Sequence, residues 1–300
     1  MSRRLGIGID AGGTKIAAGL VDLDTGEILR RETIATDAER GGQAVLDDTV
    51  MLAERLANGI TPAIASIGIG MPEIVDPTGA IRTGAVIDWV GLPCGERLGL
   101  IAPTTIEADV RAAALAEARF GAGVGRASFI YVTIGTGISS TIVLDGRPLT
   151  GARGGALVMA SAPLDVTCAS CGERTSLVLE EFAGGPAIAR RYRNATGVEV
   201  AGAIDVVEAA SKGDVDATEI LISSGHEIGV SIAFLINVID PDAVVIGGGL
   251  GSANGVFRDA LIASTRAHIW NDAARELPIE RATFGPESGM IGAALAADKS

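Results

Sequence analysis

The sequence has few aromatic residues and few cysteines. Aromatic residues make up 3% of the 300 residues and cysteine occurs three times, whereas 48% of the residues are hydrophobic. A core of this composition must be built from Ala, Val, Ile and Leu, which is typical of strands buried between helices. We therefore expect an α/β protein. The scarcity of cysteine, together with the lack of a recognisable export signal, favours a cytoplasmic location.

Basic residues and long apolar runs are also scarce. The sequence has 24 Lys and Arg against 37 Asp and Glu, a net charge of −13, and no long basic cluster. Such a protein would repel phosphate backbones, so we expect no binding to nucleic acid. The longest apolar stretch, residues 228–239, is interrupted by Ser231 and Asn237 and is too short to span a bilayer. It predicts a buried helix and no membrane association.

The first strand and turn carry the clearest chemical signal. An apolar strand ends at Asp10 and is followed by Gly12, Gly13, Thr14 and Lys15 and then by a second strand. The glycines let backbone N–H groups approach an anion, and the next two residues add a hydroxyl and an ammonium. The Asp10 carboxylate can hold a hydrated divalent cation such as Mg²⁺. An ordinary glycine-rich hairpin explains this stretch equally well when it is taken alone.

Two further glycine-rich segments follow a buried strand. Residues 128–144 predict another strand, turn and strand, and residues 242–249 predict a strand that ends in a glycine run. The turn residues are Gly135, Thr136 and Gly137, and the run is Gly247, Gly248 and Gly249. The repeated pattern suggests two similar lobes. Between the first and second glycine turns, Asp109 precedes a strong helix over residues 110–121, where an N-cap is its ordinary role.

Taken together, these segments resemble the ROK family of sugar kinases. The resemblance rests on residues 8–15, 133–138 and 245–249, which occur in the family's order and spacing. It implies a two-lobed α/β fold of the actin/hexokinase (ribonuclease H-like) type with a central cleft. The implied lobes are a smaller one at 1–114 and a larger one at 115–288, with a C-terminal helix at about 289–300 packing back onto the first. The family relation also implies a homodimer.

The resemblance implies ATP-dependent phosphorylation of the 6-hydroxyl group of a hexose. In the family the Asp of a Glu-Asn-Asp segment is the general base, and the matching segment is Glu107-Ala108-Asp109. Asp109 is therefore the expected catalytic base. The first two glycine turns would hold the ATP phosphates with Mg²⁺ near Asp10, and the third would hold the adenosine.

Several sugar-binding positions differ from the family pattern. Ala108 replaces the family's Asn, and Val158 and Ser161 replace its Glu and His, whereas Glu180 matches a sugar-contacting Glu. Glu73 stands where the family has Gly, and its carboxylate would suit a sugar ammonium. We therefore expect an amino sugar such as kanosamine as the substrate, although Glu73 could equally face solvent.

Three alternatives remain beside this hypothesis. The first is a glucokinase-like or other hexose kinase, and the second is an inactive sugar sensor, which the retained motifs disfavour. The third is a ROK-type repressor, which would need an N-terminal helix-turn-helix domain before the first phosphate motif. Of the family's zinc ligands only Cys168 and Cys171 remain, with Ser161 and Ser176 at other ligand positions, so a structural zinc ion is not expected.

Overall fold

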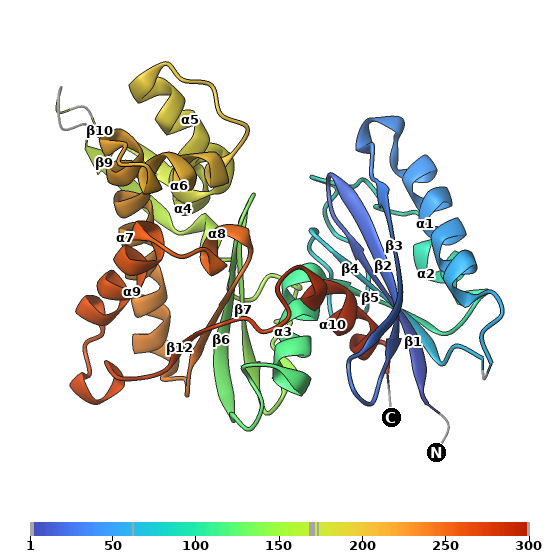
Figure 1. Cartoon of the computed structure of the whole chain (residues 1–300). Coiled ribbons are helices and arrows are strands. Elements are labelled where there is room, and N and C mark those ends of the chain that lie inside the picture. The colour runs from blue at the N-terminus through green and yellow to red at the C-terminus, as the bar shows by residue number, and fades with distance from the viewer. Residues whose placement is uncertain (1–2, 62, 168–171, 173, 299–300) are drawn as a thin grey trace. The chain divides into compact units, whose positions relative to one another are not determined.

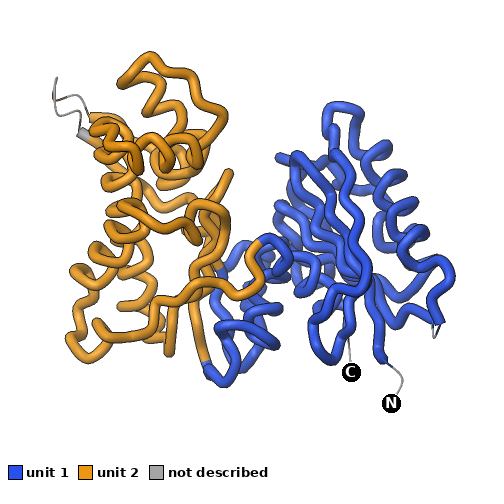
Figure 2. The backbone as a smooth tube through the Cα atoms, in the orientation of Figure 1, with its two compact units in different colours: residues 1–127, 141–156, 286–300 blue, residues 128–140, 157–285 orange. Residues whose placement is uncertain are grey.

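The computed structural model describes residues 3–61, 63–167, 172 and 174–298 (Figure 1). The chain folds into two compact units, shown in Figure 2. Unit 1 contains residues 1–127, 141–156 and 286–300, and unit 2 contains residues 128–140 and 157–285. This division places helix α3 (Asp109–Phe120) wholly in unit 1, whereas the expected first lobe ended inside that helix.

Unit 1 is built on a mixed five-stranded sheet in the order β3-β2-β1-β4-β5. Strands β1, β2 and β3 form two antiparallel hairpins, the first of which matches the strand, turn and strand predicted from the sequence, and β1, β4 and β5 are parallel. The strand bounds are β1 (Leu5–Ala11), β2 (Lys15–Asp22), β3 (Ile28–Ala35), β4 (Ser66–Met71) and β5 (Thr104–Ala108).

Strands β1 and β4 separate isoleucine and glycine onto opposite faces of this sheet. Successive side chains of a strand alternate between faces, so the patterns Gly-Ile-Gly-Ile-Asp and Ile-Gly-Ile-Gly give one apolar and one nearly bare face. The isoleucines pack with the buried residues of α1 (Gly42–Ala57) and α2 (Cys94–Gly99). The glycine face receives α3 and α10 (Ser288–Ala296), which contact each other (Figure 1).

The glycine face lets the backbone of α10 lie directly on the sheet. A Cβ atom added to Gly8 would lie 1.8 Å from the carbonyl oxygen of Met290, and one on Gly68 would lie 1.7 Å from that of Ala293. Helix α10 meets α3 in the same way, because a Cβ on Gly292 would lie 1.6 Å from the carbonyl oxygen of Ala112. No side chain fits at these three glycines without moving a helix.

Unit 2 contains most of the second five-stranded sheet, whose order is β12-β11-β6-β7-β8. Strand β11 is parallel to both of its neighbours, and β9 and β10 form a separate antiparallel pair. The strands are β6 (Ser128–Ile134), β7 (Ile138–Leu144), β8 (Arg147–Pro148), β9 (Pro163–Thr167), β10 (Arg174–Val178), β11 (Val244–Gly247) and β12 (Ile279–Arg281).

Six α-helices of the described chain belong to unit 2, and α7 is the longest. By length and composition α7 could cross a membrane, but it packs closely on α9. A Cβ on Gly229 would lie 2.6 Å from the Leu261 carbonyl oxygen of α9, so α7 is a core helix, although Phe234 and Val238 remain exposed. The helices are α4 (Leu179–Ala183), α5 (Gly185–Thr196), α6 (Ala203–Ser211), α7 (Val215–Ile239), α8 (Gly249–Ser252) and α9 (Val256–His268).

We predict that Gly68→Ala strongly destabilises the protein, because its methyl group would collide with the backbone of α10 rather than with a flexible side chain. Overpacking of a tight core typically costs about 1 to 3 kcal/mol, and we expect at least the upper value here. Urea unfolding measures the effect. Gly99→Ala is the matched control, since nothing lies within 4 Å of its added Cβ. Equal stability of the two variants would contradict the close contact.

Candidate active site

The first glycine turn connects β1 to β2, as the sequence predicts. The Gly12 N–H donates to the carbonyl oxygen of Lys15 over 3.0 Å, and the Thr36 N–H and hydroxyl donate to the carbonyls of Thr14 and Gly12. Residues Gly13, Thr14 and Lys15 are exposed. The buried Thr36 thus holds the carbonyl groups of Gly12 and Thr14, while the tip of the turn faces solvent. No sequence pattern predicted this role of Thr36.

Two carboxylates lie at the same edge of the first sheet. Asp10 is paired with Gly70 across β1 and β4, and Gly70 is paired with Glu107 across β4 and β5. Because these strands are parallel, their carboxyl ends meet at one edge, and Asp109 begins α3 directly after β5. Helix α3 begins at Asp109 and its N-cap residue is Ala108. Asp109 is therefore the first residue of the helix and not its N-cap.

Asp10 lies against the first turn of α10. A Cβ on Gly289 would lie 2.7 Å from the Asp10 carboxyl carbon, so only glycine fits there. Burial raises the pKa of Asp10 to about 6, against an opposing contribution from the Lys15 charge. Within the described residues the Asp10 carboxylate has no hydrogen bond or ion pair, which leaves its oxygens available to a ligand.

Asp109 is the second residue at this edge whose carboxyl pKa is strongly raised. Burial, and then the negative charge of Asp10, raise the pKa of Asp109 to about 7. The N–H of Val110, which donates to Asp109 Oδ1 over 2.6 Å, and the charge of Arg111 act in the opposite direction. A carboxylate with a pKa near neutrality is suited to accept a proton at physiological pH.

Arg111 holds the start of α3 in place. Its buried guanidinium donates to Glu107 Oε1 over 2.6 Å, to the Gly154 carbonyl over 2.8 Å and to the Val75 carbonyl over 2.7 Å. These contacts tie the helix that carries Asp109 to two loops of unit 1. Arg111 was not among the residues predicted from the sequence, although a lone arginine in an alanine-rich stretch of helix is a usable signal.

Glu73 does not take the role expected from the sequence. It is 5% exposed, and its carboxylate accepts hydrogen bonds from the Thr83 hydroxyl and from the N–H groups of Ala85, Val86 and Ile87. Burial alone would raise the pKa of Glu73, but these four donors outweigh it and lower the pKa. Its acceptor sites are filled by its own chain, which corrects both the ammonium-binding and the solvent-facing interpretations.

In unit 2 the second and third glycine segments lie next to each other. Gly247 is paired with Thr133 across β11 and β6, and a Cβ on Gly135 would lie 3.8 Å from the N atom of Gly249. Gly248 has a φ of +80°, and its Cβ would lie 2.3 Å from the Ile134 carbonyl oxygen. The structure therefore brings together the two segments that were expected to bind phosphate and adenosine.

Glu180 supports the second turn from α4. Its Oε2 accepts the N–H of Ile138 over 2.6 Å and would lie 2.7 Å from a Cβ on Gly137. The N–H of Gly185 donates to the carbonyl oxygen of Gly135 over 2.9 Å. At least one oxygen of Glu180 is thus used within unit 2, beside the turn formed by Gly135, Thr136 and Gly137.

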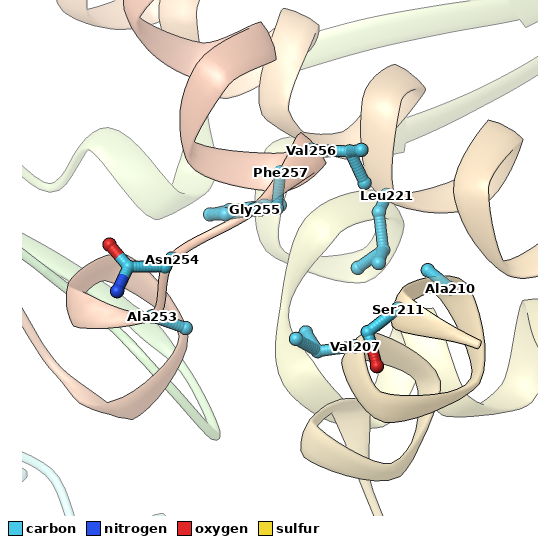
Figure 3. A pocket seen from close by; sticks show the side chains of 9 residues that line it. All are labelled: Val207, Ala210, Ser211, Leu221, Ala253, Asn254, Gly255, Val256 and Phe257. Atoms are coloured by element: carbon cyan, nitrogen blue, oxygen red, sulfur yellow. The ribbon is translucent and has the colours of Figure 1, made fainter. Parts of the chain in front are cut away.

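A small, mostly apolar cavity opens near the glycine run of unit 2. It has a volume of about 100 Å³ and lies between α6, Leu221 of α7 and residues 253–257, which connect α8 to α9 (Figure 3). The lining residues are Val207, Ala210, Ser211, Leu221, Ala253, Asn254, Gly255, Val256 and Phe257. The sequence did not predict this cavity, because its walls come from helices without a distinctive motif.

The remaining expected substrate residues show no common polar cluster in the described contacts. Ala108 is buried at the end of β5, Val158 is half exposed, and the Ser161 hydroxyl donates to the Val158 carbonyl over 2.8 Å. The expectation about zinc rests on Cys168 and Cys171, which lie outside the described residues.

Comparisons with known proteins agree on one family. The sequence model described as "ROK family" matches residues 6–300. The Brucella melitensis protein named "Bifunctional enzyme NanE/NanK" is 34% identical over 291 residues. That match covers 96% of this chain and 53% of the relative, so this chain spans about half the length of that protein.

Two solved structures share both fold and sequence. A ROK hexokinase from Thermus thermophilus is 32% identical with a TM-score of 0.80, covering 97% of each chain. A ROK family glucokinase from Streptomyces griseus, in complex with glucose and AMPPNP, is 29% identical with a TM-score of 0.81, covering 97% of this chain and 98% of that one. The expected two-lobed α/β fold class is confirmed. Since the match includes all three glycine segments and the carboxylate edge, this chain belongs to the ROK family.

Proposed function

We propose that this chain is an ATP-dependent kinase that phosphorylates the 6-hydroxyl group of a hexose. The observation that carries the proposal is the carboxylate edge, where Asp10 and the near-neutral Asp109 lie beside the glycine turn of unit 1. The similarity to a glucokinase whose structure contains glucose and AMPPNP supports the same reaction. A cytoplasmic location is part of the proposal.

Asp109 would act as the general base. Its carboxylate would accept the proton of the sugar hydroxyl as that oxygen attacks the γ-phosphorus of ATP, and the bond from this phosphorus to the bridging oxygen of ADP would break. A pKa of about 7 leaves a substantial fraction ionised at neutral pH and still allows proton uptake. Arg111 would keep Asp109 in position through its contacts to Glu107 and Val75.

Asp10 fits a magnesium ion. Mg²⁺ prefers carboxylate oxygens and retained water molecules, and the Asp10 carboxylate is partly buried without a hydrogen-bond partner in the described chain. When bound, Mg²⁺ would neutralise charge on the ATP phosphates. The residues of both glycine turns would contact those phosphates through their N–H groups, and Lys15 would add a positive charge.

The cavity between α6 and residues 253–257 would receive the adenine ring. It is largely apolar, it offers Asn254 and Ser211 as polar groups, and Ala253 directly follows α8, which begins at Gly249. A flat apolar base with a few polar edge atoms matches such a pocket. This placement agrees with the adenosine role that the resemblance implied for Gly247, Gly248 and Gly249.

A neutral hexose is a better substrate candidate than an amino sugar. The expectation of kanosamine depended on Glu73, whose four acceptor contacts lie within its own chain. A sugar ammonium would have to displace these donors and leave buried N–H groups unpaired, which costs about 1 to 3 kcal/mol for each group. The proposal therefore returns to a glucokinase-like or other hexose kinase.

We predict that a screen of ADP release over glucose, mannose, glucosamine and kanosamine gives the highest kcat/KM with a neutral hexose. In Glu73→Gln the ratio of kcat/KM for kanosamine to that for glucose should stay within about threefold of wild type, since Glu73 does not contact the sugar amine. If wild type preferred kanosamine tenfold, which corresponds to about 1.4 kcal/mol, and Glu73→Gln lost this preference, Glu73 would bind the sugar ammonium group after all.

We predict that Asp109→Asn lowers kcat by about 10²- to 10⁴-fold, the usual effect of losing a general base. The amide has nearly the same shape but cannot accept the proton. Nucleotide affinity, measured by calorimetry, should stay close to that of wild type. Turnover within a few-fold of wild type on the best sugar would exclude Asp109 as the base.

Unfolding experiments on metal-free wild type and on metal-free Asp109→Asn provide a control that does not depend on activity. The pKa of Asp109 is raised by folding, so its contribution to stability is full below its ordinary pKa and is lost as the pH rises through about 7. The free energy of unfolding of wild type should therefore fall between pH 5 and pH 8. The fall should be smaller in Asp109→Asn, which remains folded.

We also propose a homodimer, with the exposed face of α7 as the contact. Phe234 and Val238 are each 65% exposed, and Trp270, whose backbone N–H donates to Asn237 Oδ1 over 2.9 Å, is 87% exposed. Large exposed apolar side chains gathered on one helix face often mark an interface. Light scattering at micromolar concentration should give a dimer mass for wild type and a monomer mass for Phe234→Glu. A monomeric wild type would contradict this proposal.

A further inference from the structure

The buried carboxylate of Glu73 organises a loop of unit 1 that has no regular secondary structure. Glu73 Oε1 accepts the N–H groups of Val86 and Ile87 over 2.6 and 3.0 Å. Oε2 accepts the N–H of Ala85 over 3.0 Å and the hydroxyl of Thr83. One side chain thus binds both ends of a five-residue segment, which we call the 83–87 loop.

The chain just after the 83–87 loop is fixed by a second contact. Trp89 is fully buried, and its indole N–H donates to the Gly42 carbonyl oxygen at the start of α1 over 2.9 Å. A Cβ on Gly42 would lie 1.8 Å from the Asp88 carbonyl oxygen, so the two backbones touch. The 83–87 loop is therefore fixed by the Glu73 carboxylate, and the residues that directly follow it are fixed by α1.

The 83–87 loop in turn contacts the first glycine turn. Val86 Cγ1 would lie 2.6 Å from a Cβ atom on Gly13, so the valine side chain lies directly over that glycine. The N–H of the same Val86 is the backbone donor that lies closest to a Glu73 oxygen. A continuous path of contacts leads from Glu73 through Val86 to the turn that follows Asp10.

We propose that Glu73 is a positioning residue, which holds Val86 against Gly13 and so fixes the glycine turn beside Asp10 and Asp109. Its catalytic consequence rests on the proposed kinase function, whereas the anchoring itself does not. In this role the carboxylate never touches the substrate. It acts through backbone N–H groups, to which a carboxylate offers two acceptor oxygens and a glutamine amide group only one.

Asp76 provides a matched control in the same segment. Its carboxylate accepts the N–H and hydroxyl of Thr78, the N–H of Ala80 and the guanidinium of Arg82, and these bonds anchor the adjacent turn. None of these donors belongs to the 83–87 loop. Asp76→Asn therefore removes one anchoring charge, as Glu73→Gln does, from a turn that does not reach Gly13.

The test uses Trp89 as a reporter that needs no activity. The sequence has two tryptophans, so Trp270→Phe leaves Trp89 as the only source of tryptophan emission. In this background Glu73→Gln should shift the emission to longer wavelength and raise acrylamide quenching about twofold. It should also speed amide exchange of residues 85–87 by about 10-fold or more, because local opening exposes their N–H groups. Asp76→Asn should change none of these signals.

The catalytic consequence is tested on the full-length enzyme with its best sugar. Glu73→Gln should lower kcat by about 10- to 100-fold with the KM for ATP within about twofold, because small displacements of aligned groups are costly. Val86→Ala, which keeps every Glu73 hydrogen bond, should lower kcat in the same direction without changing Trp89 emission. Asp76→Asn should keep kcat within about twofold of wild type, because none of the donors to Asp76 belongs to the 83–87 loop.

Two results would overturn the proposal. Unchanged emission and amide exchange in Glu73→Gln would show that the carboxylate does not anchor the loop. A loosened loop with unchanged kcat would show that the anchoring does not position the site. A wild type inactive on every sugar would refute the kinase function instead, and the emission and exchange measurements would still decide whether Glu73 anchors the loop.

Discussion

The contact between the backbone of α10 and the glycine face of the first sheet determines where the carboxylates lie. Gly8 and Gly68 let α10 lie on β1 and β4, and Gly292 lets α3 lie beside it. Because the backbones of both helices touch their neighbours, the first turn of α10 lies against Asp10. Asp109, the first residue of α3, lies at the same edge of the sheet. Two acidic groups are thereby confined to one partly buried strand edge, and their raised pKa values follow from that confinement.

The surrounding charges then adjust what the packing creates. Asp10 and Glu73 raise the pKa of Asp109, whereas the Val110 N–H and the Arg111 guanidinium lower it. Arg111 serves a second purpose, because it also bridges Glu107 to the loops at Val75 and Gly154. Position and ionisation of the proposed base therefore depend on the same buried guanidinium, a coupling typical of functional sites.

The sequence predicted the elements whose signals are local. The strand that ends at Asp10, the glycine turns, and the two strands within residues 128–144 were predictable, because apolar runs and turn residues act within a few positions of the chain. Within residues 150–219, β9, β10 and α4 to α6 were not predicted, although α5 carries a helical period in which Ile188 and Tyr192, four residues apart, are both buried. The contacts of Glu73 could not be predicted from the sequence. Its hydrogen-bond donors lie 10 to 14 residues away, in a loop whose conformation is defined only in the folded chain.

The central claim is that Asp109 and the glycine turns transfer the γ-phosphoryl group of ATP to the 6-hydroxyl of a hexose. The most direct measurement is ³¹P nuclear magnetic resonance of wild-type protein incubated with Mg²⁺, ATP and the preferred hexose. We predict one new phosphomonoester signal, coupled to the two protons on C6 and equal in amount to the ADP formed. ADP with inorganic phosphate alone, or a phosphate ester at another carbon, would contradict the claim.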